Sequence, residues 1–141
     1  MPGILTRDEE LRALLAKTRT IAVVGGSPRP DRPSHGVMAA LQRAGYRAIP
    51  VNPAAAGQSI LGEPVYASLG EIPVPIDMVD VFRRAEDTPP VARDAVAIGA
   101  KSLWLQLGIA SAEAAAIATA GGLDVVMDRC TAIEIGRLGP R

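Results

Sequence analysis

Glycine, arginine and amide residues gather in five clusters of this sequence, and residues of these types are suited to binding a phosphorylated ligand. The clusters occupy residues 25–29, 52–53, 83–84, 106–108 and 128–130, and each follows an apolar run. Every run has the length of a buried β-strand. Open sheets of parallel strands bind ligands outside the carboxyl ends of the strands, so these clusters would meet at one edge. The sequence therefore predicts where a ligand binds.

The first cluster, at residues 25–29, leads from a strand toward a helix. A glycine loop in this position offers backbone N–H groups and the positive end of a helix dipole to an anion, which favours phosphate contact. A tight turn that merely needs glycine is the alternative. The dinucleotide-binding fingerprint is incomplete because Ser27 replaces its second glycine, and the second strand ends in Asn52-Pro53 instead of an acidic residue. Both departures disfavour NAD as the ligand.

Arginines at the predicted strand ends are a second sign of a phosphate site. Arg83 and Arg129 directly follow strands and are the stronger candidates, because a guanidinium binds phosphate through two parallel hydrogen bonds. A purely solubilising role is the alternative for any one arginine. At another strand end, Gln106 and Gly108 bracket a turn in which the amide side chain can contact the ligand or simply face solvent. The arginines of these loops are Arg29, Arg32, Arg83, Arg84 and Arg129.

Cys130 and His35 are the only cysteine and histidine of the chain. Cys130 stands beside Arg129 where a helix begins, which favours a nucleophilic thiolate, although a small residue that fills a buried niche is the alternative. His35 follows the glycine loop and either donates to a phosphate or faces solvent. Asp128 is expected to order its loop or to pair with Arg129. One cysteine and one histidine cannot supply a zinc site, and neither the Gly-x-Ser-x-Gly elbow nor the P-loop motif occurs. We therefore expect no metal and no enzymatic activity.

Five strands are expected, at residues 21–24, 47–51, 78–82, 103–105 and 124–127, with a short extended piece at 64–66. Helices alternate with the strands, which predicts an α/β fold with a mostly parallel five-stranded sheet. Ser34 and Thr88 are expected to cap helices that end near glycines, and an Ala-rich helix is expected at residues 111–120. Residues 6–9 and 131–134 have the spacing of capping boxes, the first before a helix with leucines at helical spacing and the second before a short last helix.

Composition limits the remaining possibilities. The 141 residues suit a single domain, and 48% are apolar but only 3% aromatic, which favours a close-packed core of aliphatic side chains. Fifteen basic residues balance fifteen acidic ones, so nucleic acid and acidic membranes are not expected as partners. No apolar run approaches the ~20 residues of a membrane span, no signal peptide is evident, and a single cysteine fits a cytoplasmic location.

Seven segments, taken in order, resemble the small stand-alone CoA-binding proteins, which are similar to the CoA-binding domain of the succinyl-CoA synthetase α subunit. The resemblance covers residues 18–138 of the predicted single domain 1–141. The segments are IAVVG at 21–25, RPS at 32–34, GYR at 45–47, IPVNP at 49–53, VDVFRR at 79–84, WLQLG at 104–108 and VMDRC at 126–130.

The resemblance implies a three-layer, Rossmann-like nucleotide-binding fold with the ADP part of coenzyme A across the strand ends. Residues 25–29 would hold the pyrophosphate, residues 52–53 and 82–83 the adenosine side, and residues 106–108 the region toward the pantetheine. No segment resembles the domain that carries the phosphohistidine of the larger synthetases, so ligase activity is not implied. The predicted CoA-binding residues are Gly25, Gly26, Ser27, Arg29, Asn52, Pro53, Phe82, Arg83, Gln106, Gly108, Asp128, Arg129 and Cys130.

Coenzyme A also fits the residues taken by themselves. Its pyrophosphate and its 3′-phosphate can occupy several arginines, and the 3′-phosphate would repel an acidic ribose clamp, which explains a neutral Asn52. The leading hypothesis is a non-catalytic protein that binds CoA or acyl-CoA. The alternatives are a small NAD(P)-dependent oxidoreductase and a thiol redox protein that forms a mixed disulfide between Cys130 and CoA.

Overall fold

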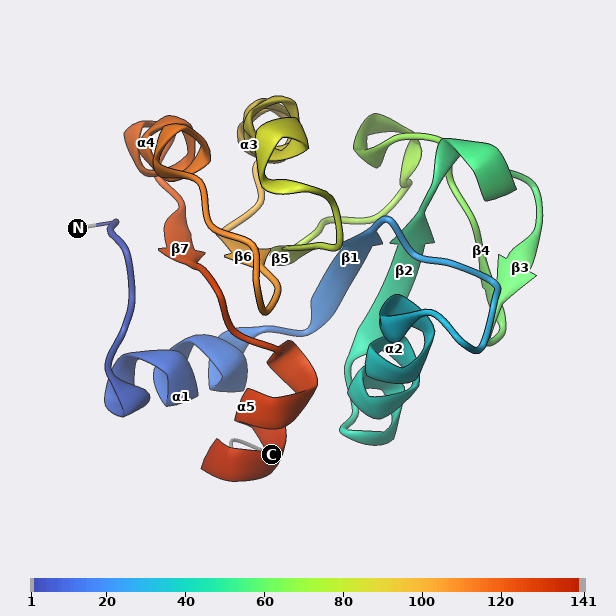
Figure 1. Cartoon of the computed structure of the whole chain (residues 1–141), viewed down its shortest axis with the longest axis horizontal. Helices are drawn as coiled ribbons and strands as arrows, with labels where there is room; N and C mark the ends of the chain where they lie inside the picture. Colours follow the sequence, from blue (N-terminus) through green and yellow to red (C-terminus); the bar gives the residue numbers. More distant parts are fainter. Residues whose placement is uncertain (1, 140–141) are drawn as a thin grey trace.

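The computed structural model describes residues 2–139 and places five parallel strands in one sheet with helices on both faces (Figure 1). The strands lie in the order β2-β1-β5-β6-β7. Because the chain passes from β1 to β2 on one side and later to β5 on the other, the order reverses at β1, and such a switch point opens a crevice at the carboxyl ends. The bounds are β1 Thr20–Val24, β2 Arg47–Val51, β5 Met78–Val81, β6 Ser102–Leu105 and β7 Asp124–Val126.

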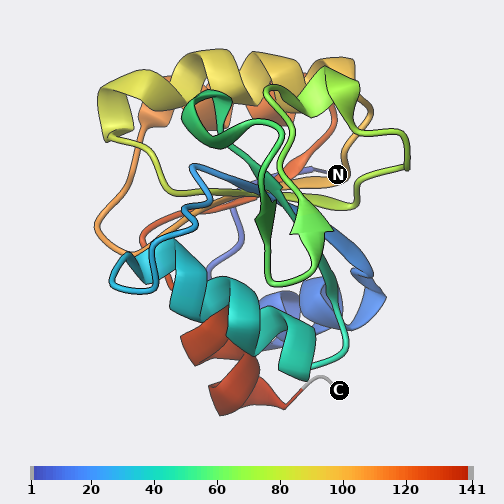
Figure 2. The same ribbon diagram turned by 90° about the vertical axis from the view of Figure 1, so that its right-hand side faces the viewer.

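Helices cover the sheet in two layers, which Figures 1 and 2 show from two sides. The helices α1 (Asp8–Lys17), α2 (Pro33–Arg43) and α5 (Thr131–Leu138) pack on one face, and α3 (Thr88–Ala97) and α4 (Ala112–Ala120) pack on the other. Each layer encloses its own apolar cluster. The predicted three-layer, Rossmann-like α/β architecture is confirmed. None of the described helices is long and apolar enough to cross a membrane.

Strand side chains alternate between the two clusters. In β1, Ile21 and Val23 join the cluster beneath α1, α2 and α5, whereas Ala22 and Val24 join the other. Strands that are covered on both faces read as continuous apolar runs, which is the pattern seen in the sequence. Two polar side chains of the described strands are buried, that of Asp80 in β5 and that of Ser102 at the start of β6.

The predicted strands are confirmed with small changes at their ends. β5 and β7 end one residue earlier than expected, so Phe82 and Met127 belong to the loops. Ile4 forms an isolated parallel bridge with Val125 of β7, which extends the sheet by a pairing that the sequence did not predict. The edge of β7 is therefore covered by the N-terminal segment.

Both predicted N-caps lie inside their helices, because the capping residues are Arg32 and Asp87. Ser34 lies inside α2, and its hydroxyl oxygen accepts the N–H of Ser27 at 3.0 Å. Thr88 is the first residue of α3, and its hydroxyl donates to the preceding turn η3 (Ala85–Asp87). Both hydroxyls bond to neighbouring loops instead of capping their helices. Ser111, expected as the first residue of a helix, instead caps α4, because its hydroxyl oxygen accepts the N–H of Ala114.

The predicted capping boxes are also corrected. The carboxylate of Glu10, and not that of Glu9, accepts the N–H groups of Thr6 and Arg7, at 3.2 and 3.1 Å, because α1 begins one residue later than expected. At the second box, Thr131 is already helical and its hydroxyl is directed into a buried polar group of the site.

The segment between β2 and β5 packs beside the sheet as a small appendage, drawn in green in Figure 2. It contains the turn η1 (Pro53–Ala55), a hairpin of β3 (Ser59–Ile60) and β4 (Glu63–Pro64), and the turn η2 (Leu69–Glu71). Tyr66 forms a parallel bridge with Val51, so the extended piece predicted at 64–66 is confirmed.

Candidate functional site

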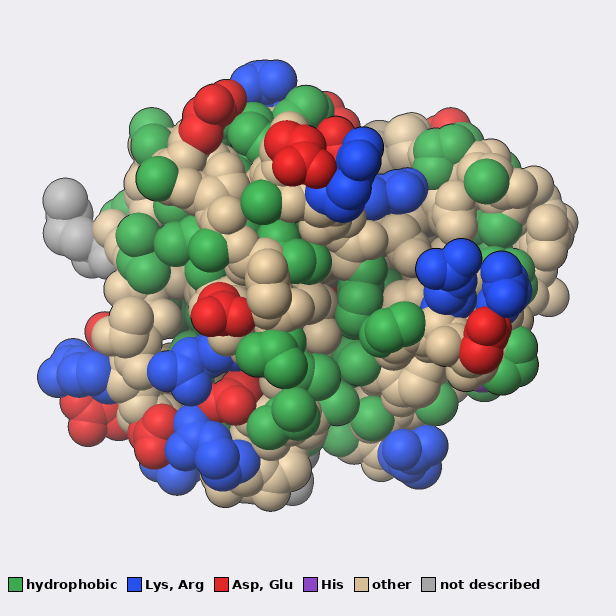
Figure 3. Space-filling model, in the orientation of Figure 1, with side chains coloured by type: hydrophobic (Ala, Val, Ile, Leu, Met, Phe, Trp, Pro, Cys, Tyr) green, Lys and Arg blue, Asp and Glu red, His purple; other side chains and the backbone are tan. Residues whose placement is uncertain are grey.

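The carboxyl ends of the strands open into a cleft of about 880 Å³. Figure 3 shows basic side chains over the β1–α2 and β5–α3 loops, with apolar side chains between them and α5. The cleft lies at the edge that the sequence predicts. The predicted residues that line it are Gly25, Ser27, Arg29, Asn52, Phe82, Arg83, Gln106 and Cys130. The predicted residues that do not line it are Gly26, Pro53, Gly108, Asp128 and Arg129.

Glycine at the end of β1 is required by close packing. Gly25 has φ +91°, and a Cβ there would collide with the carbonyl oxygen of Phe82 at the end of the neighbouring strand. A Cβ on Gly26 would lie 2.9 Å from Pro50 Cβ. These contacts let the ends of β1, β2 and β5 approach one another at the back of the cleft.

The glycine loop does not offer the free backbone donors that the sequence suggested. The N–H groups of Gly25 and Gly26 donate to strand carbonyls, at 2.8 and 3.3 Å. The N–H of Ser27 donates to Ser34 Oγ and that of Arg29 to Ser27 Oγ, at 3.0 and 3.1 Å, and the proline between Ser27 and Arg29 has no N–H. Donors for an anion at this end of the cleft are therefore side chains and the first turn of α2.

Asn52 stiffens the same end of the cleft from β2. Its Nδ2 donates to Gly26 O at 2.9 Å and its Oδ1 accepts the N–H of Ala54 at 3.0 Å. Pro53 begins η1 and lines a smaller hollow of about 160 Å³, which Arg83 also borders. The Asn52 amide therefore connects the ends of β1 and β2 by hydrogen bonds.

The arginines that line the cleft differ in their partners. Arg29 pairs with Asp31 at 3.0 Å, and Arg84 pairs with acidic residues of η3. The guanidinium groups of Arg32 and Arg83 have no hydrogen bond or ion pair within residues 2–139. Arg83 is half-buried, so it presents an unpaired cation in partly desolvated surroundings, where an anion is held more strongly than in water.

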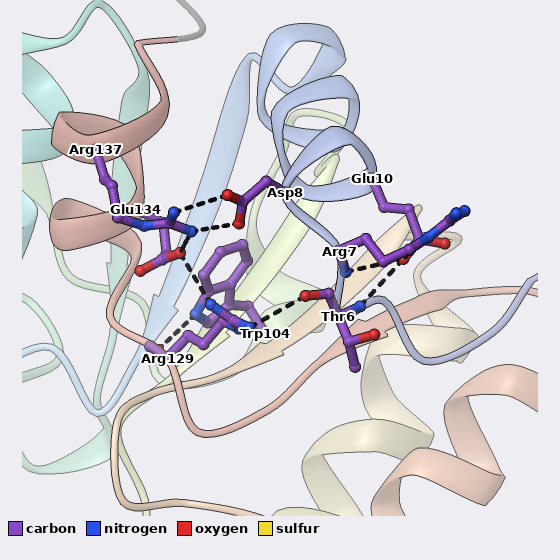
Figure 4. Close-up of polar contacts among 8 residues, drawn as sticks. All are labelled: Thr6, Arg7, Asp8, Glu10, Trp104, Arg129, Glu134 and Arg137. Carbon is purple, nitrogen blue, oxygen red and sulfur yellow. Dashed lines mark hydrogen bonds and ion pairs between the residues drawn. The ribbon is translucent and has the colours of Figure 1, made fainter.

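Arg129, the other strong candidate, turns away from the cleft. Its guanidinium binds Glu134 Oε1 and the carbonyl oxygen of Thr6, each at 3.1 Å (Figure 4). Its own carbonyl oxygen accepts the indole N–H of Trp104 at 2.7 Å. A phosphate role for Arg129 is therefore replaced by a structural one, because it joins the N-terminal segment to α5.

Gly108 and Asp128 join two exposed loops beside the cleft. Asp128 Oδ1 accepts the N–H of Gly108 at 2.7 Å, and the N–H of Asp128 donates to Ile109 O at 3.0 Å. Both residues have positive φ, +85° and +57°. Asp128 thus orders its loop, one of the two roles expected for it, and the link holds Leu107 and Ile109 against the cleft.

Gln106 is held by residues that the sequence did not single out as a site. Its Oε1 accepts both the N–H and the hydroxyl of Thr131, each at 3.1 Å. The same hydroxyl lies 3.0 Å from Asp80 Oδ2. Burial raises the pKa of Asp80 to about 8, against a smaller lowering by the hydrogen bond from Thr131. The available signal was an acidic residue inside an otherwise apolar strand.

Cys130 is half-buried, lines the cleft and precedes the first turn of α5, whereas His35 does not line the cleft. Apolar side chains that the sequence did not select complete this wall, including Val37, Ile109 and Ile133. No group of three or more potential metal ligands is present in the described part of the chain. The cleft therefore joins a basic end to an apolar end that carries one thiol and one amide.

Comparison with known proteins supplies a family. A model described as a CoA-binding domain matches residues 19–136. The uncharacterized protein YneT of Bacillus subtilis (strain 168) is 45% identical over 121 residues, which is 86% of this chain and 88% of that protein. The structure of cell-free ID.343 from Thermus thermophilus has a TM-score of 0.90 and 39% identity, covering 94% of this chain and 99% of that one. A hypothetical protein from Pyrococcus horikoshii OT3 has a TM-score of 0.90 and 37% identity, covering 94% and 92%.

Proposed function

The chain belongs to the CoA-binding domain family, and on that premise we propose that it binds coenzyme A with the ADP part across the carboxyl edge of the sheet. The observation that carries the proposal is the unpaired, half-buried guanidinium of Arg83 at a cleft whose β2 end carries the neutral Asn52. A dinucleotide-binding site of the NAD type would place an acidic residue there.

The chemistry of the cleft suggests how the ligand lies. The pyrophosphate belongs near Ser27, Arg32 and the first turn of α2, where side-chain donors and the helix dipole favour negative charge. The adenosine side belongs near Asn52 and Arg83, beside the smaller hollow. The pantetheine arm, which is neutral and largely apolar, then follows the wall made by Gln106, the β6–α4 loop and α5.

We also propose that binding is the whole function of the site. The cleft is lined by no carboxylate and no histidine within the described residues, and these are the groups that most often transfer protons in catalysis. The hydroxyl oxygens of Ser27 and Ser34 accept N–H groups of the glycine loop, which leaves their protons to donate to a bound anion. A carrier or a CoA-dependent recruiting protein would need no more than this.

Isothermal titration with CoA, NAD and NADP tests the proposal. We expect saturable binding of CoA and weaker or unmeasurable binding of both dinucleotides. Tight binding of NADP without binding of CoA would overturn the proposal in favour of an NAD(P)-dependent oxidoreductase, which an assay of nicotinamide absorbance would then examine.

The alternative to binding alone is thiol exchange with CoA, which is supported by the position of Cys130 on the wall of the cleft. The Cys130 thiolate would attack one sulfur of CoA disulfide, forming a bond between its Sγ and that sulfur while the second CoA leaves as a thiolate. Intact mass after treatment with CoA disulfide should then show one CoA adduct that Cys130→Ala lacks. An unchanged mass of the parent protein would dismiss this function.

A further inference from the structure

A series of buried, hydrogen-bonded polar side chains leads from the middle of the sheet to the cleft, and its inner end is Asp80. Asp80 is fully buried and lies in register between Val23 of β1 and Trp104 of β6. Its Oδ2 lies 3.0 Å from Thr131 Oγ1, and its Oδ1 has no partner in the described part of the chain. Such surroundings penalise a carboxylate strongly, whereas a carboxylic acid needs only one acceptor for its proton.

The hydroxyl of Thr131 can satisfy its two neighbours in only one way. It has one proton, and both Asp80 Oδ2 and Gln106 Oε1 lie within 3.1 Å of it. If Asp80 carries a proton, that proton is donated to Thr131 Oγ1, and the hydroxyl proton goes on to Gln106 Oε1. Every short contact among Asp80, Thr131 and Gln106 then joins one donor to one acceptor.

The backbone fixes which end of the Gln106 amide points inward. The N–H of Thr131 has a fixed direction and lies 3.1 Å from Gln106 Oε1, so a reversed amide would set two donors against each other. Within the described residues, the side-chain atoms that are both fully buried and without a partner are Asp80 Oδ1 and Ser102 Oγ. Gln106 Nε2 is not among them, so this nitrogen is accessible from the cleft that Gln106 lines. The cleft therefore meets a hydrogen-bond donor at this point.

Asp80 is suited to hold this arrangement at neutral pH. Burial raises its pKa to about 8, and the only other influence is the hydrogen bond from Thr131, with no charged side chain of the neighbouring β1, β6 or α5 contributing. Above this pH the carboxylate would take the Thr131 proton for itself. Gln106 Oε1 would then keep a single donor, and the amide would be less firmly oriented.

We infer that Asp80 is a positioning residue which, through Thr131, fixes the Gln106 amide with its nitrogen toward the cleft, so that this wall selects a carbonyl oxygen of the ligand's amide-containing arm. The inference rests on the proposed function, which places the pantetheine arm along Gln106. Asp80 itself does not touch the ligand.

The test compares S-methyl-CoA, which has no titrating thiol, with adenosine 3′,5′-bisphosphate, which lacks the arm. Affinities of both are measured by titration calorimetry at pH 7 and pH 9. In Thr131→Val, which removes the hydroxyl donor to Gln106 Oε1, S-methyl-CoA should bind roughly 3- to 10-fold more weakly at pH 7, the effect of one lost neutral hydrogen bond, while the bisphosphate is unchanged. Asp80→Asn donates to Thr131 as the acid does, so it should keep the parent affinity. Ser102→Ala, which removes the other buried unpaired side chain, is the matched control and should change neither ligand.

The pH profile separates positioning from general damage. In the parent protein the affinity for S-methyl-CoA, relative to the bisphosphate, should fall by a similar factor between pH 7 and pH 9, and in Asp80→Asn it should stay flat. Equal losses for both ligands in Thr131→Val, or the same pH profile in the parent and in Asp80→Asn, would overturn the inference while leaving CoA binding intact. Failure of the parent protein to bind S-methyl-CoA would overturn the proposed function itself. If Thr131→Val does not fold, the profile of Asp80→Asn decides alone.

Discussion

The two sides of the cleft use polar side chains in opposite ways. On the basic side, guanidinium groups reach the surface, and two of them have no partner within residues 2–139. On the closed side, the polar side chains are hydrogen-bonded to other groups of the protein, and the side chains that face the cleft are mainly apolar. The basic side consists of Arg29, Arg32 and Arg83, and the closed side of Gln106, Asp128, Arg129 and Thr131.

This difference teaches that position after a strand does not decide the role of an arginine. Arg83 and Arg129 each follow a strand in the same sheet, but only Arg83 remains available to an anion. What separates them is the presence of Glu134 and a free backbone carbonyl beside Arg129. A ligand with phosphates at one end and a long neutral arm at the other matches a cleft divided in this way.

The largest effect is expected for the pH dependence of folding stability, which arises on the closed side. The raised pKa of Asp80, about 8, means that the folded protein holds its proton more tightly than the unfolded chain does. The free energy of unfolding should therefore fall as pH rises from about 4 to about 8, by roughly 1.4 kcal/mol per pH unit at most. Above about pH 8 it should level off. Urea unfolding at pH 5, 6, 7 and 8 measures this slope.

Asp80→Asn removes the titrating group and should be more stable than the parent at pH 8, with a flat profile between pH 5 and pH 8. The pKa of Asp8 is lowered by its hydrogen bond with Arg137, and that of Glu10 by backbone N–H groups, so both titrate below this window. Parallel profiles of the parent and the variant would show that Asp80 is ionised in the folded protein.

The next effect tests the packing behind the basic side. Gly25→Ala places a Cβ against the Phe82 carbonyl oxygen at a positive φ, so we expect a loss of about 3 kcal/mol in the free energy of unfolding, from both the collision and the left-handed backbone. Gly36→Ala is the control, since its Cβ meets nothing within 4 Å on α2, and it should be neutral or stabilising. Equal stability of the two variants would refute the close approach of β1 and β5.

The third effect sets the two arginines against each other. Arg83→Ala should weaken CoA binding by roughly 1.5–3 kcal/mol, the effect of one charge-assisted hydrogen bond, with stability unchanged. Arg129→Ala should leave CoA binding unchanged and lower stability by about 1 kcal/mol, because it frees the buried Glu134 from one partner. Calorimetry and urea unfolding of both variants measure the four values.

Titration with 3′-dephospho-CoA locates the contact of Arg83. If Arg83→Ala weakens binding of this ligand less than binding of CoA, the 3′-phosphate lies at Arg83. Loss of CoA binding in Arg129→Ala alone would reverse the assignment of the two sides.

Most of the fold was predictable because its determinants are local. Strands that are covered on both faces are almost entirely apolar, and glycine marks turns that need a positive φ. The strands and the loops that form the cleft could therefore be located from short runs of residues. Helix starts were less predictable, because the hydroxyls of Ser34 and Thr131 bond to partners in other segments. A capping signal cannot reveal that a stronger tertiary partner exists.

The details of the site depended on distant contacts. The partner of Arg129 is the carbonyl of Thr6, 123 positions away in the chain, and that of Asp80 is Thr131, 51 positions away. The glycine loop was placed correctly at the cleft, but the bonding of its N–H groups depends on Ser34 and on the neighbouring strands. Residue type therefore predicted which loops form the cleft, and only the tertiary structure shows which groups in them are free.

The smallest effect concerns the apolar surface of the closed side. Ile133 is 55% exposed and lines the cleft, while Ile4 is 50% exposed and lies on the far edge of the sheet beside β7. Ile133→Ser removes apolar surface that the pantetheine arm would cover, so CoA affinity should fall roughly 2- to 5-fold, as expected for a partly buried side chain. Adenosine 3′,5′-bisphosphate should bind equally well to the parent and to this variant. Ile4→Ser is the control for exposed isoleucine and should leave both ligands unaffected. If Ile133→Ser weakened the bisphosphate as much as CoA, the phosphates would have to extend to the closed side, and the division of the cleft into a charged end and a neutral end would fail.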